Sequence, residues 1–178
     1  MSGYRFDRLR LLVIDDNAYM RKLISTILRA FGVANVYEAD SAKAAWQAMR
    51  DVNPDVLFMD WMTDGKSGIE LVRMIRTSAA SPNPFVPIIM LSGHTQLGRV
   101  QEARDAGCNE FLAKPVSVNS IMTRLISVIE NPRPFVRTKS YFGPCRRRRE
   151  HENYLGPERR AAESTATATE SNPFDAVA

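Results

Sequence analysis

Five polar residues stand at the ends of short apolar runs in the sequence. Three are carboxylates, one is a hydroxyl and one is an amine: Asp15, Asp16, Asp60, Ser92 and Lys114. Carboxylates that gather in one place resist joint ionisation unless a cation neutralises them. Oxygen ligands with room for water suit a hard ion, so the three acids predict a Mg²⁺ site.

The same residue types can carry a phosphoryl group. A carboxylate such as that of Asp60 can attack phosphorus and form an acyl phosphate. Lys114 would supply a fixed positive charge, and Ser92 a hydroxyl donor, to the oxygens of that group. A metal ion and a lysine together offset the charge on a transferred phosphoryl group. The set therefore predicts phosphoryl acceptance on an aspartate, assisted by Mg²⁺.

Alternating strands and helices must bring these residues together. Short apolar runs predict buried strands at 9–14, 36–39, 56–59, 87–91 and 110–113. Apolar residues at helical spacing predict helices at 18–30, 41–50, 68–76, 96–106 and 118–130. Such alternation implies an α/β fold, a doubly wound five-stranded parallel sheet with helices on both faces. Ligands bind beyond the carboxyl ends of its strands, where the polar residues should meet.

Taken singly, each of these residues has a blander interpretation. An acid at a strand end is usually just solvated, Lys114-Pro115 is usually a turn, and Ser92 could cap a helix. Their joint occurrence at the strand ends of one alternating fold favours the functional interpretation.

The motifs VIDDN, MDWM with Gly68 after it, LSG and AKP resemble the response-regulator receiver family, typified by the chemotaxis protein CheY. The resemblance covers about residues 8–130 and implies the flavodoxin-like strand order 2-1-3-4-5. It implies phosphorylation of Asp60, with Ser92 and Lys114 contacting the phosphoryl group. Phe111 takes the position of the family's switch aromatic residue.

The resemblance also implies how the metal is held. Asp16 and Asp60 would bind Mg²⁺ directly, Asp15 mainly through water, and Met62 through its backbone carbonyl. The family usually has Met-Pro after the position of Met62, whereas this chain has Thr63-Asp64, so this loop is expected to move differently. His94 lies near the expected water entry, but a lone histidine is more often a surface residue and receives no role.

The positive charge of the chain is concentrated after residue 130. The net charge is +4, and residues 133–149 (RPFVRTKSYFGPCRRRR) hold seven basic side chains and no acid. Arginine and interleaved aromatic rings can bind guanine edges, stack on bases and neutralise phosphates. The composition fits a guanine-containing anion, although RNA or an acidic membrane surface fits by chemistry alone.

The extension is expected to be flexible without a ligand, because it has little apolar surface to offset its ordering entropy. The expected organisation is a receiver domain at 8–130, an arginine-rich extension at 131–160 and a disordered tail at 161–178.

A receiver followed by RPFVRTKSYFGPxRRRR resembles the Cle proteins, CheY-like effectors of cyclic di-GMP with an arginine-rich extension. This resemblance implies cyclic di-GMP as a ligand and a flagellar motor switch protein as a partner. Cys145 stands where the family extension often has Asp, and a thiol accepts hydrogen bonds poorly. The implied nucleotide-binding residues are Arg133, Arg137, Thr138, Lys139, Tyr141, Phe142, Arg146, Arg147, Arg148 and Arg149.

Three functions therefore compete. The first is a cyclic di-GMP-responsive, motor-directed receiver that serves a sensor histidine kinase or phosphotransfer protein. The second is a plain receiver with a passive tail. The third is a nucleic-acid regulator that uses the tail, although the lack of a helix-turn-helix pattern makes DNA binding a weak alternative. Residues 131–178 are too few and too polar for an enzymatic core, so no enzyme is expected.

Composition also bounds the location of the protein. No apolar run reaches the ~18 residues that span a bilayer. The N-terminus lacks the apolar core of a signal peptide. Two cysteines, Cys108 and Cys145, are too few for a disulfide framework. The chain is expected to be cytoplasmic with free thiols, and the Cle resemblance adds recruitment to the flagellated pole.

Overall fold

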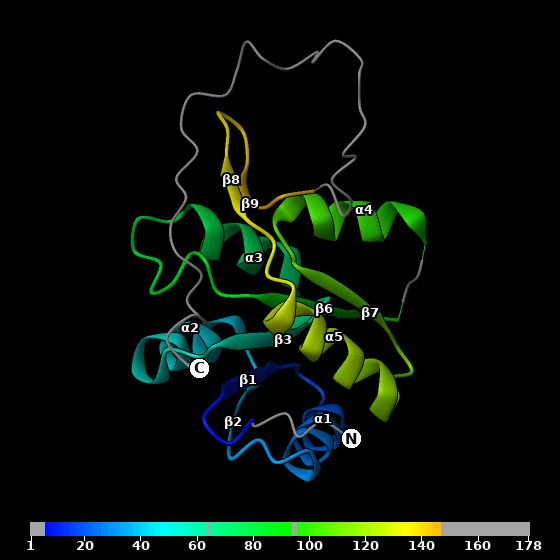
Figure 1. Cartoon of the computed structure of the whole chain (residues 1–178). Coiled ribbons are helices and arrows are strands. Elements are labelled where there is room, and N and C mark those ends of the chain that lie inside the picture. Colours follow the sequence, from blue (N-terminus) through cyan, green and yellow to red (C-terminus); the bar gives the residue numbers. More distant parts are fainter. Residues whose placement is uncertain (1–5, 64, 94–95, 147–178) are drawn as a thin grey trace.

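The computed structural model shows a central sheet flanked by helices, with a small hairpin beyond them (Figure 1). It describes residues 6–63, 65–93 and 96–146. The strands of the central sheet lie in the order β2-β1-β3-β6-β7, and every neighbouring pair is parallel. This confirms the predicted order. The strands are β1 (Arg10–Ile14), β2 (Asn35–Ala39), β3 (Val56–Asp60), β6 (Ile88–Ser92) and β7 (Glu110–Ala113).

Helices follow the strands as predicted, and polar caps set several of their starts. Asn17 and Ser117 each accept a hydrogen bond from a backbone amide in the first turn of their helix, at 3.1 Å in both cases. Such caps satisfy amides that have no partner within the helix. The helices are α1 (Ala18–Ala30), α2 (Ala42–Val52), α3 (Gly68–Thr77), α4 (Leu97–Ala106) and α5 (Val118–Glu130).

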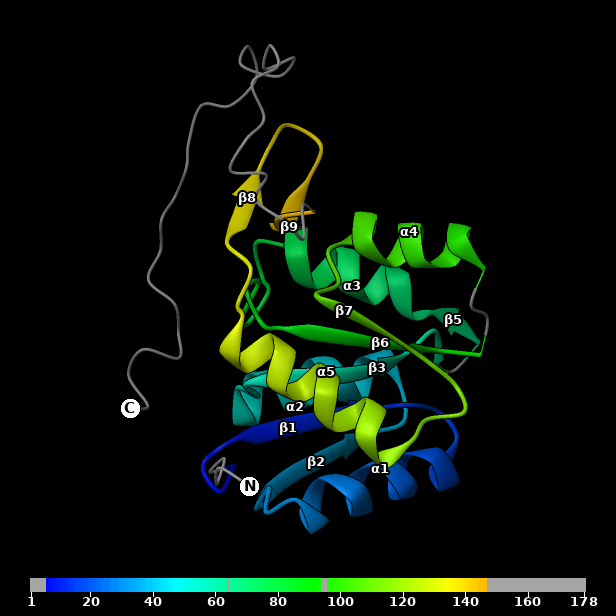
Figure 2. The same ribbon diagram turned by 45° about the vertical axis from the view of Figure 1, so that its right-hand side comes forward.

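The two faces of the sheet carry separate apolar cores. Leu11 and Val13 of β1 pack with α1 and α5, and Leu12 and Ile14 pack with α2, α3 and α4. Figure 2 shows α1 and α5 together on one face of the sheet. Because the strands are buried on both faces, they read as continuous apolar runs. This packing fixes the strands so that their carboxyl ends meet at one edge.

Two short antiparallel ladders were not predicted. β4 (Met62–Thr63) pairs with β5 (Lys66–Ser67), directly after β3. Gly65 in its turn has φ 68°, a left-handed conformation that favours glycine. β8 (Phe135–Arg137) pairs with β9 (Phe142–Pro144) within the arginine-rich extension.

The β8–β9 hairpin corrects the expectation of an extension that is flexible throughout. The rings of Phe135 and Phe142 each lie 5.2 Å, centroid to centroid, from the ring of Phe85 in an edge-on arrangement. The predicted flexibility follows from the apolar surface of the extension alone. Phe85, in the loop at 78–87, supplies the apolar surface against which the hairpin packs. Residues 147–160 and the tail at 161–178 lie outside the described residues.

Two further expectations concern location and redox state. Within the described ranges, no helix combines the length and hydropathy needed to cross a membrane. Cys108 and Cys145 are both free thiols, as predicted, and burial raises the pKa of Cys108 to about 12.

Candidate functional site

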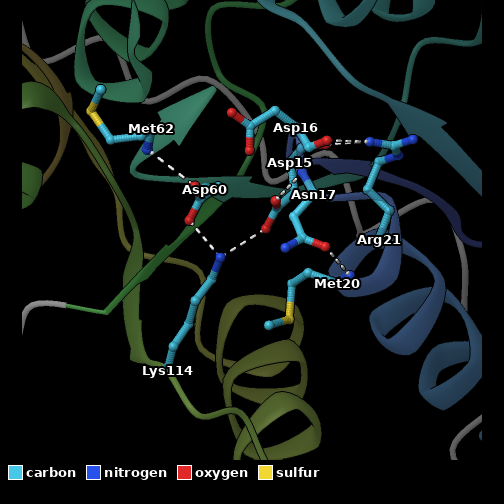
Figure 3. Close-up of polar contacts among 8 residues, drawn as sticks. All are labelled: Asp15, Asp16, Asn17, Met20, Arg21, Asp60, Met62 and Lys114. Carbon is cyan, nitrogen blue, oxygen red and sulfur yellow. Dashed lines mark hydrogen bonds and ion pairs between the residues drawn. The ribbon is translucent and has the colours of Figure 1, made fainter. Parts of the chain in front are cut away.

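Three carboxylates meet at the carboxyl ends of β1 and β3 (Figure 3). Candidate ligand oxygens of Asp15, Asp16 and Asp60 all lie within 4.8 Å of one another. Asp15 is buried, Asp60 is half-buried and Asp16 is exposed, so one side of the cluster opens to solvent. Hard oxygen donors with space for water suit Mg²⁺. The donor set therefore fits the predicted metal.

Lys114 spans two of these carboxylates (Figure 3). Its Nζ lies 2.8 Å from Asp15 Oδ2 and 2.7 Å from Asp60 Oδ1. Burial favours the neutral amine, yet the hydrogen bonds with Asp15 and Asp60 raise the pKa of Lys114 above its ordinary value. A charged ammonium group is therefore held beside Asp60 at neutral pH.

The backbone after β1 is fixed by contacts that the sequence pattern does not predict. The amide of Asn17 donates to Asp15 Oδ1 at 2.9 Å. Arg21 Nη1 donates to the carbonyls of Asp15 and Asp16, at 2.7 and 3.2 Å. The only signal for Arg21 was a basic residue in the helix that follows paired acids. These bonds fix the Asp15 carboxylate and the backbone that carries Asp16.

The loop after Asp60 explains the glycine in the motif. The amide of Met62 donates to Asp60 Oδ2 at 3.2 Å, and the amide of Gly68 donates to the carbonyl of Trp61 at 2.7 Å. A Cβ on Gly68 would lie 2.2 Å from the Asp60 carbonyl oxygen, so only glycine fits here. The structure thus gives Met62 a backbone role beside Asp60.

Two of the predicted receiver residues lie on β6 and β7. Ser92 ends β6 in a buried position, and its carbonyl accepts a hydrogen bond from the Lys114 amide at 2.8 Å. Phe111 is half-buried in β7 and packs against the core on the α4 side. Ser92 therefore belongs to the edge that carries the acids, whereas Phe111 belongs to the neighbouring α4 surface. Asp64 and His94 lie outside the described residues.

The extension residues divide into two groups. The guanidinium of Arg137 lies 4.4 Å from the centroid of the Phe142 ring, and that of Arg146 lies 4.0 Å from the Tyr141 ring. Lys139 is exposed in the turn that the Thr138–Tyr141 backbone hydrogen bond closes. Arg146 also pairs with Asp105 of α4, at 3.5 Å.

Arg133 has a different position from these residues. It donates to the carbonyls of Cys108, Asn109 and Cys145. A nucleotide would have to compete with these carbonyls for its guanidinium. Arg147, Arg148 and Arg149 lie beyond the described part of the chain.

Burial of Asp60 leads to a prediction about stability and pH. Burial raises the pKa of Asp60, the Asp15 charge adds to this, and Lys114 and the Met62 amide oppose it. An acid whose pKa is higher in the folded state destabilises that state once it is ionised. Asp60→Asn should therefore raise the melting temperature by a few degrees at neutral pH without metal.

The gain should vanish below about pH 3, where Asp60 is protonated in both the folded and the unfolded chain. Scanning calorimetry in a chelator at both pH values measures it. Asp51→Asn, which changes an exposed carboxylate on α2, is the control and should leave the melting temperature unchanged. A melting temperature of Asp60→Asn below that of the parent at neutral pH would contradict this reading of the site.

Comparison with known proteins identifies the family. The family described as "Response regulator receiver domain" matches residues 11–126. The chain belongs to the response regulator receiver family. Receiver domains are signalling modules rather than enzymes, are phosphorylated on an aspartate by a histidine kinase or phosphotransfer partner, and bind Mg²⁺ at an acidic pocket. The match ends at residue 126, before the hairpin.

CheY-like proteins are among the relatives of this receiver. Over 122 residues it is 29% identical to the chemotaxis protein CheY of Pseudomonas aeruginosa, covering 68% of this chain and 97% of that protein. Over 123 residues it is 32% identical to CheY1 of Helicobacter pylori, with coverage of 68% and 97%. The solved structure of Vibrio cholerae CheY4 superposes with a TM-score of 0.61 at 26% identity, covering 67% of this chain and 98% of that one.

Proposed function

We propose that this receiver accepts a phosphoryl group on Asp60, and that its arginine-rich extension binds cyclic di-GMP to control contact with a flagellar motor switch protein. One observation carries the first half: Lys114 Nζ contacts Asp60 and Asp15 at 2.7 and 2.8 Å within a cluster of three carboxylates. The proposal places the protein in the cytoplasm, with recruitment to the flagellated pole.

Phosphoryl transfer requires an ionised Asp60. One of its oxygens attacks the phosphorus, the bond between phosphorus and the donor breaks, and the electron pair leaves with the donor's imidazole or carboxylate. Lys114 is placed to meet the charge that gathers on the phosphoryl oxygens, and Asp15 holds its amine in position. Mg²⁺ bound directly by Asp16, Asp60 and the Met62 carbonyl, with Asp15 contacting it mainly through water, would offset further negative charge.

Incubation of the full chain with acetyl phosphate tests this half of the proposal. Label should appear with Mg²⁺ and be suppressed when a chelator removes the metal. Label that is independent of Mg²⁺ would argue against the acidic cluster as the reacting site.

Stacked arginines support the nucleotide half of the proposal. Arg137 and Arg146 each present a guanidinium plane backed by an aromatic ring, at 4.4 and 4.0 Å. Such planes can stack on a guanine or bind its O6 and N7 edge. Cyclic di-GMP offers two guanines and two phosphates to this surface.

A groove beside the extension supports control of a protein partner. It has a volume of about 400 Å³ and runs between α4 and β7. Leu97, Val100 and Phe111 line it from the receiver, and Arg133 and Arg146 line it from the extension. A partner docked here would contact both the switch aromatic residue and the extension, so either signal could change its affinity.

Loss of Arg137 should weaken the binding of cyclic di-GMP. One bidentate guanine contact contributes ~1–3 kcal/mol, so Arg137→Ala should lower the affinity roughly tenfold or more. An Arg147→Ala/Arg148→Ala double variant should do the same. Isothermal titration calorimetry of the full chain measures both, and Lys22→Ala on the exposed side of α1 is the charge-matched control for Arg137→Ala.

The competing functions give different titrations. If the parent did not bind cyclic di-GMP, or if both arginine variants bound it with unchanged affinity, the result would favour a plain receiver with a passive tail. Equal binding of GTP or short RNA, with a steep loss in salt, would indicate non-specific electrostatic binding to the basic tail.

A further inference from the structure

A fully buried arginine lies under the hairpin. Arg76 is 3% exposed and has only neutral acceptors among its hydrogen-bond partners. Its Nε and Nη2 donate to the Gly107 carbonyl at 3.1 and 3.0 Å, and Nη1 donates to the Pro84 carbonyl at 2.7 Å. Burial lowers its pKa to about 10, so it stays charged at neutral pH. Because no carboxylate is among these partners, the cost of burying this charge must be offset by hydrogen bonds and by contacts with aromatic rings.

The hairpin supplies one of these contacts. The Cζ atom of Arg76 lies 5.1 Å from the centroid of the Phe135 ring, which therefore covers the guanidinium. Phe85 and Phe142 pack against the same ring, at 5.2 and 5.6 Å. Phe135 thus closes a site that α3 and the loop at 78–87 leave incomplete.

The backbones of the hairpin and the receiver approach very closely at two glycines. A Cβ on Gly107 would lie 3.1 Å from Arg76 Cγ and 3.3 Å from the Phe142 carbonyl oxygen. A Cβ on Gly143 would lie 3.0 Å from Gly107 Cα. There is no room for a side chain between the two segments. The hairpin is therefore seated on the receiver by shape as well as by its aromatic rings.

Arg133 ties the base of the hairpin to residues 107–109, which we call the α4–β7 junction. Its guanidinium donates to the Cys108 and Asn109 carbonyls of the junction, and also to the Cys145 carbonyl of the extension. The Cys145 amide in turn donates to the Pro134 carbonyl at 2.7 Å. One side chain therefore joins both ends of the hairpin to the segment that leaves α4 and enters β7.

The junction leads directly to the switch position. Phe111 lies two residues beyond Asn109 and shares the α4–β7 groove with Arg133 and Arg146. Arg146 also pairs with Asp105 of α4, at 3.5 Å. Anything that moves α4 or β7 relative to α3 must therefore strain or break the contacts of Arg76, Arg133 and Phe135.

We infer that the β8–β9 hairpin is a fixed part of this receiver and clamps the α4–β7 junction, holding α4 and Phe111 in place. The hairpin and α4 are then expected to move together, because they belong to one packed unit. The clamp connects the extension to the α4–β7 groove that Phe111 lines, and it does so without contact between the hairpin and Asp60. Its coupling to phosphorylation rests on the proposed role of Asp60.

Hydrogen–deuterium exchange on the full chain tests the clamp. Phe135→Leu keeps an apolar side chain but removes the ring over Arg76, and Arg133→Lys keeps the charge but removes the planar fork. Each should speed exchange in residues 103–112 roughly tenfold, because local opening of that segment becomes easier. Ser140→Ala, in the exposed turn of the same hairpin, is the control and should leave the segment unchanged.

Exchange in α5, on the opposite face of the sheet, separates a clamp from general stabilisation. The clamp predicts parent-like exchange in residues 118–130 of both variants. Unchanged exchange in 103–112, or equal acceleration in 118–130, would overturn the inference.

A second arm measures transmission from the phosphorylation site. Beryllium fluoride with Mg²⁺, which mimics an aspartyl phosphate, should change exchange in residues 60–63 and at the same time in 135–144. Because coupling between two sites is reciprocal, a clamp that holds α4 must respond when α4 is moved. A response in 60–63 with none in 135–144 would overturn transmission. No response in 60–63 would instead count against Asp60, and the variants alone would then decide the clamp.

Discussion

Asp60→Asn is expected to abolish phosphorylation of this receiver by acetyl phosphate. The asparagine amide has nearly the same shape as the carboxylate, but it is not a nucleophile that can form an acyl phosphate. Lys114 keeps its contact with Asp15, at 2.8 Å, so the remaining site should stay assembled. Phosphorylation is therefore lost because the nucleophile is absent and not because the site is disrupted. The loss of label should be complete rather than partial.

Intact-mass spectrometry after incubation with acetyl phosphate and Mg²⁺ measures this loss. Asp51→Asn makes the same chemical change at an exposed position on α2 and should label like the parent. Circular dichroism should show both variants folded. Substantial label on Asp60→Asn would mean that another group accepts the phosphoryl group.

Arg76→Ala is expected to destabilise the fold strongly, because Arg76 is buried and all its printed hydrogen-bond partners are neutral acceptors. The change leaves the buried Gly107 carbonyl and the part-buried Pro84 carbonyl without their side-chain donor. Asn109 Oδ1 loses the Arg76 donor at 3.2 Å but keeps the Ile88 amide at 3.1 Å. Unpaired buried acceptors and the empty volume together should lower the free energy of unfolding by about 3–5 kcal/mol.

Urea unfolding of the full chain measures this change. Arg73→Ala is the matched control, because it removes an exposed arginine from the same helix and should alter the free energy of unfolding by less than about 0.5 kcal/mol. If the two variants lost equal stability, the buried contacts of Arg76 would have no special role. If Arg76→Ala were too unstable to purify, Arg76→Lys would give the same comparison at a smaller loss.

The acidic site could be predicted from sequence because its members end strands of a regular alternating pattern. Asp15 and Asp60 follow fully apolar runs, and parallel strands bring such residues to one edge. Lys114 follows the last strand in the same way. Their roles follow from the presence of three carboxylates, a hydroxyl and an amine at strand ends, and the local sequence shows these residue types directly.

Arg76 could not be predicted as a buried hub. In the sequence it is a basic residue in the last turn of a helix, a position where arginine is favourable at the surface. Its burial depends on Pro84, Gly107 and Phe135, which come from three separate segments. Only the folded chain shows that these segments converge.

The hairpin escaped prediction for a related reason. The extension alone has little apolar surface, and Phe85 lies in a stretch whose Pro, Ser and Asn content indicates only a loop. The ladder of β4 and β5 is too short for any periodic signal. Pairing between such distant or short segments is decided by packing, which composition does not encode.

Phosphorylation of Asp60 is tested most directly by locating the phosphoryl group in the parent chain. Borohydride reduces an acyl phosphate and marks the residue that carried it, and peptide mass spectrometry then identifies the position. We expect a mark on Asp60 that requires Mg²⁺ during labelling. A mark on Asp15, Asp16 or any other residue, with Asp60 unmodified, would contradict it.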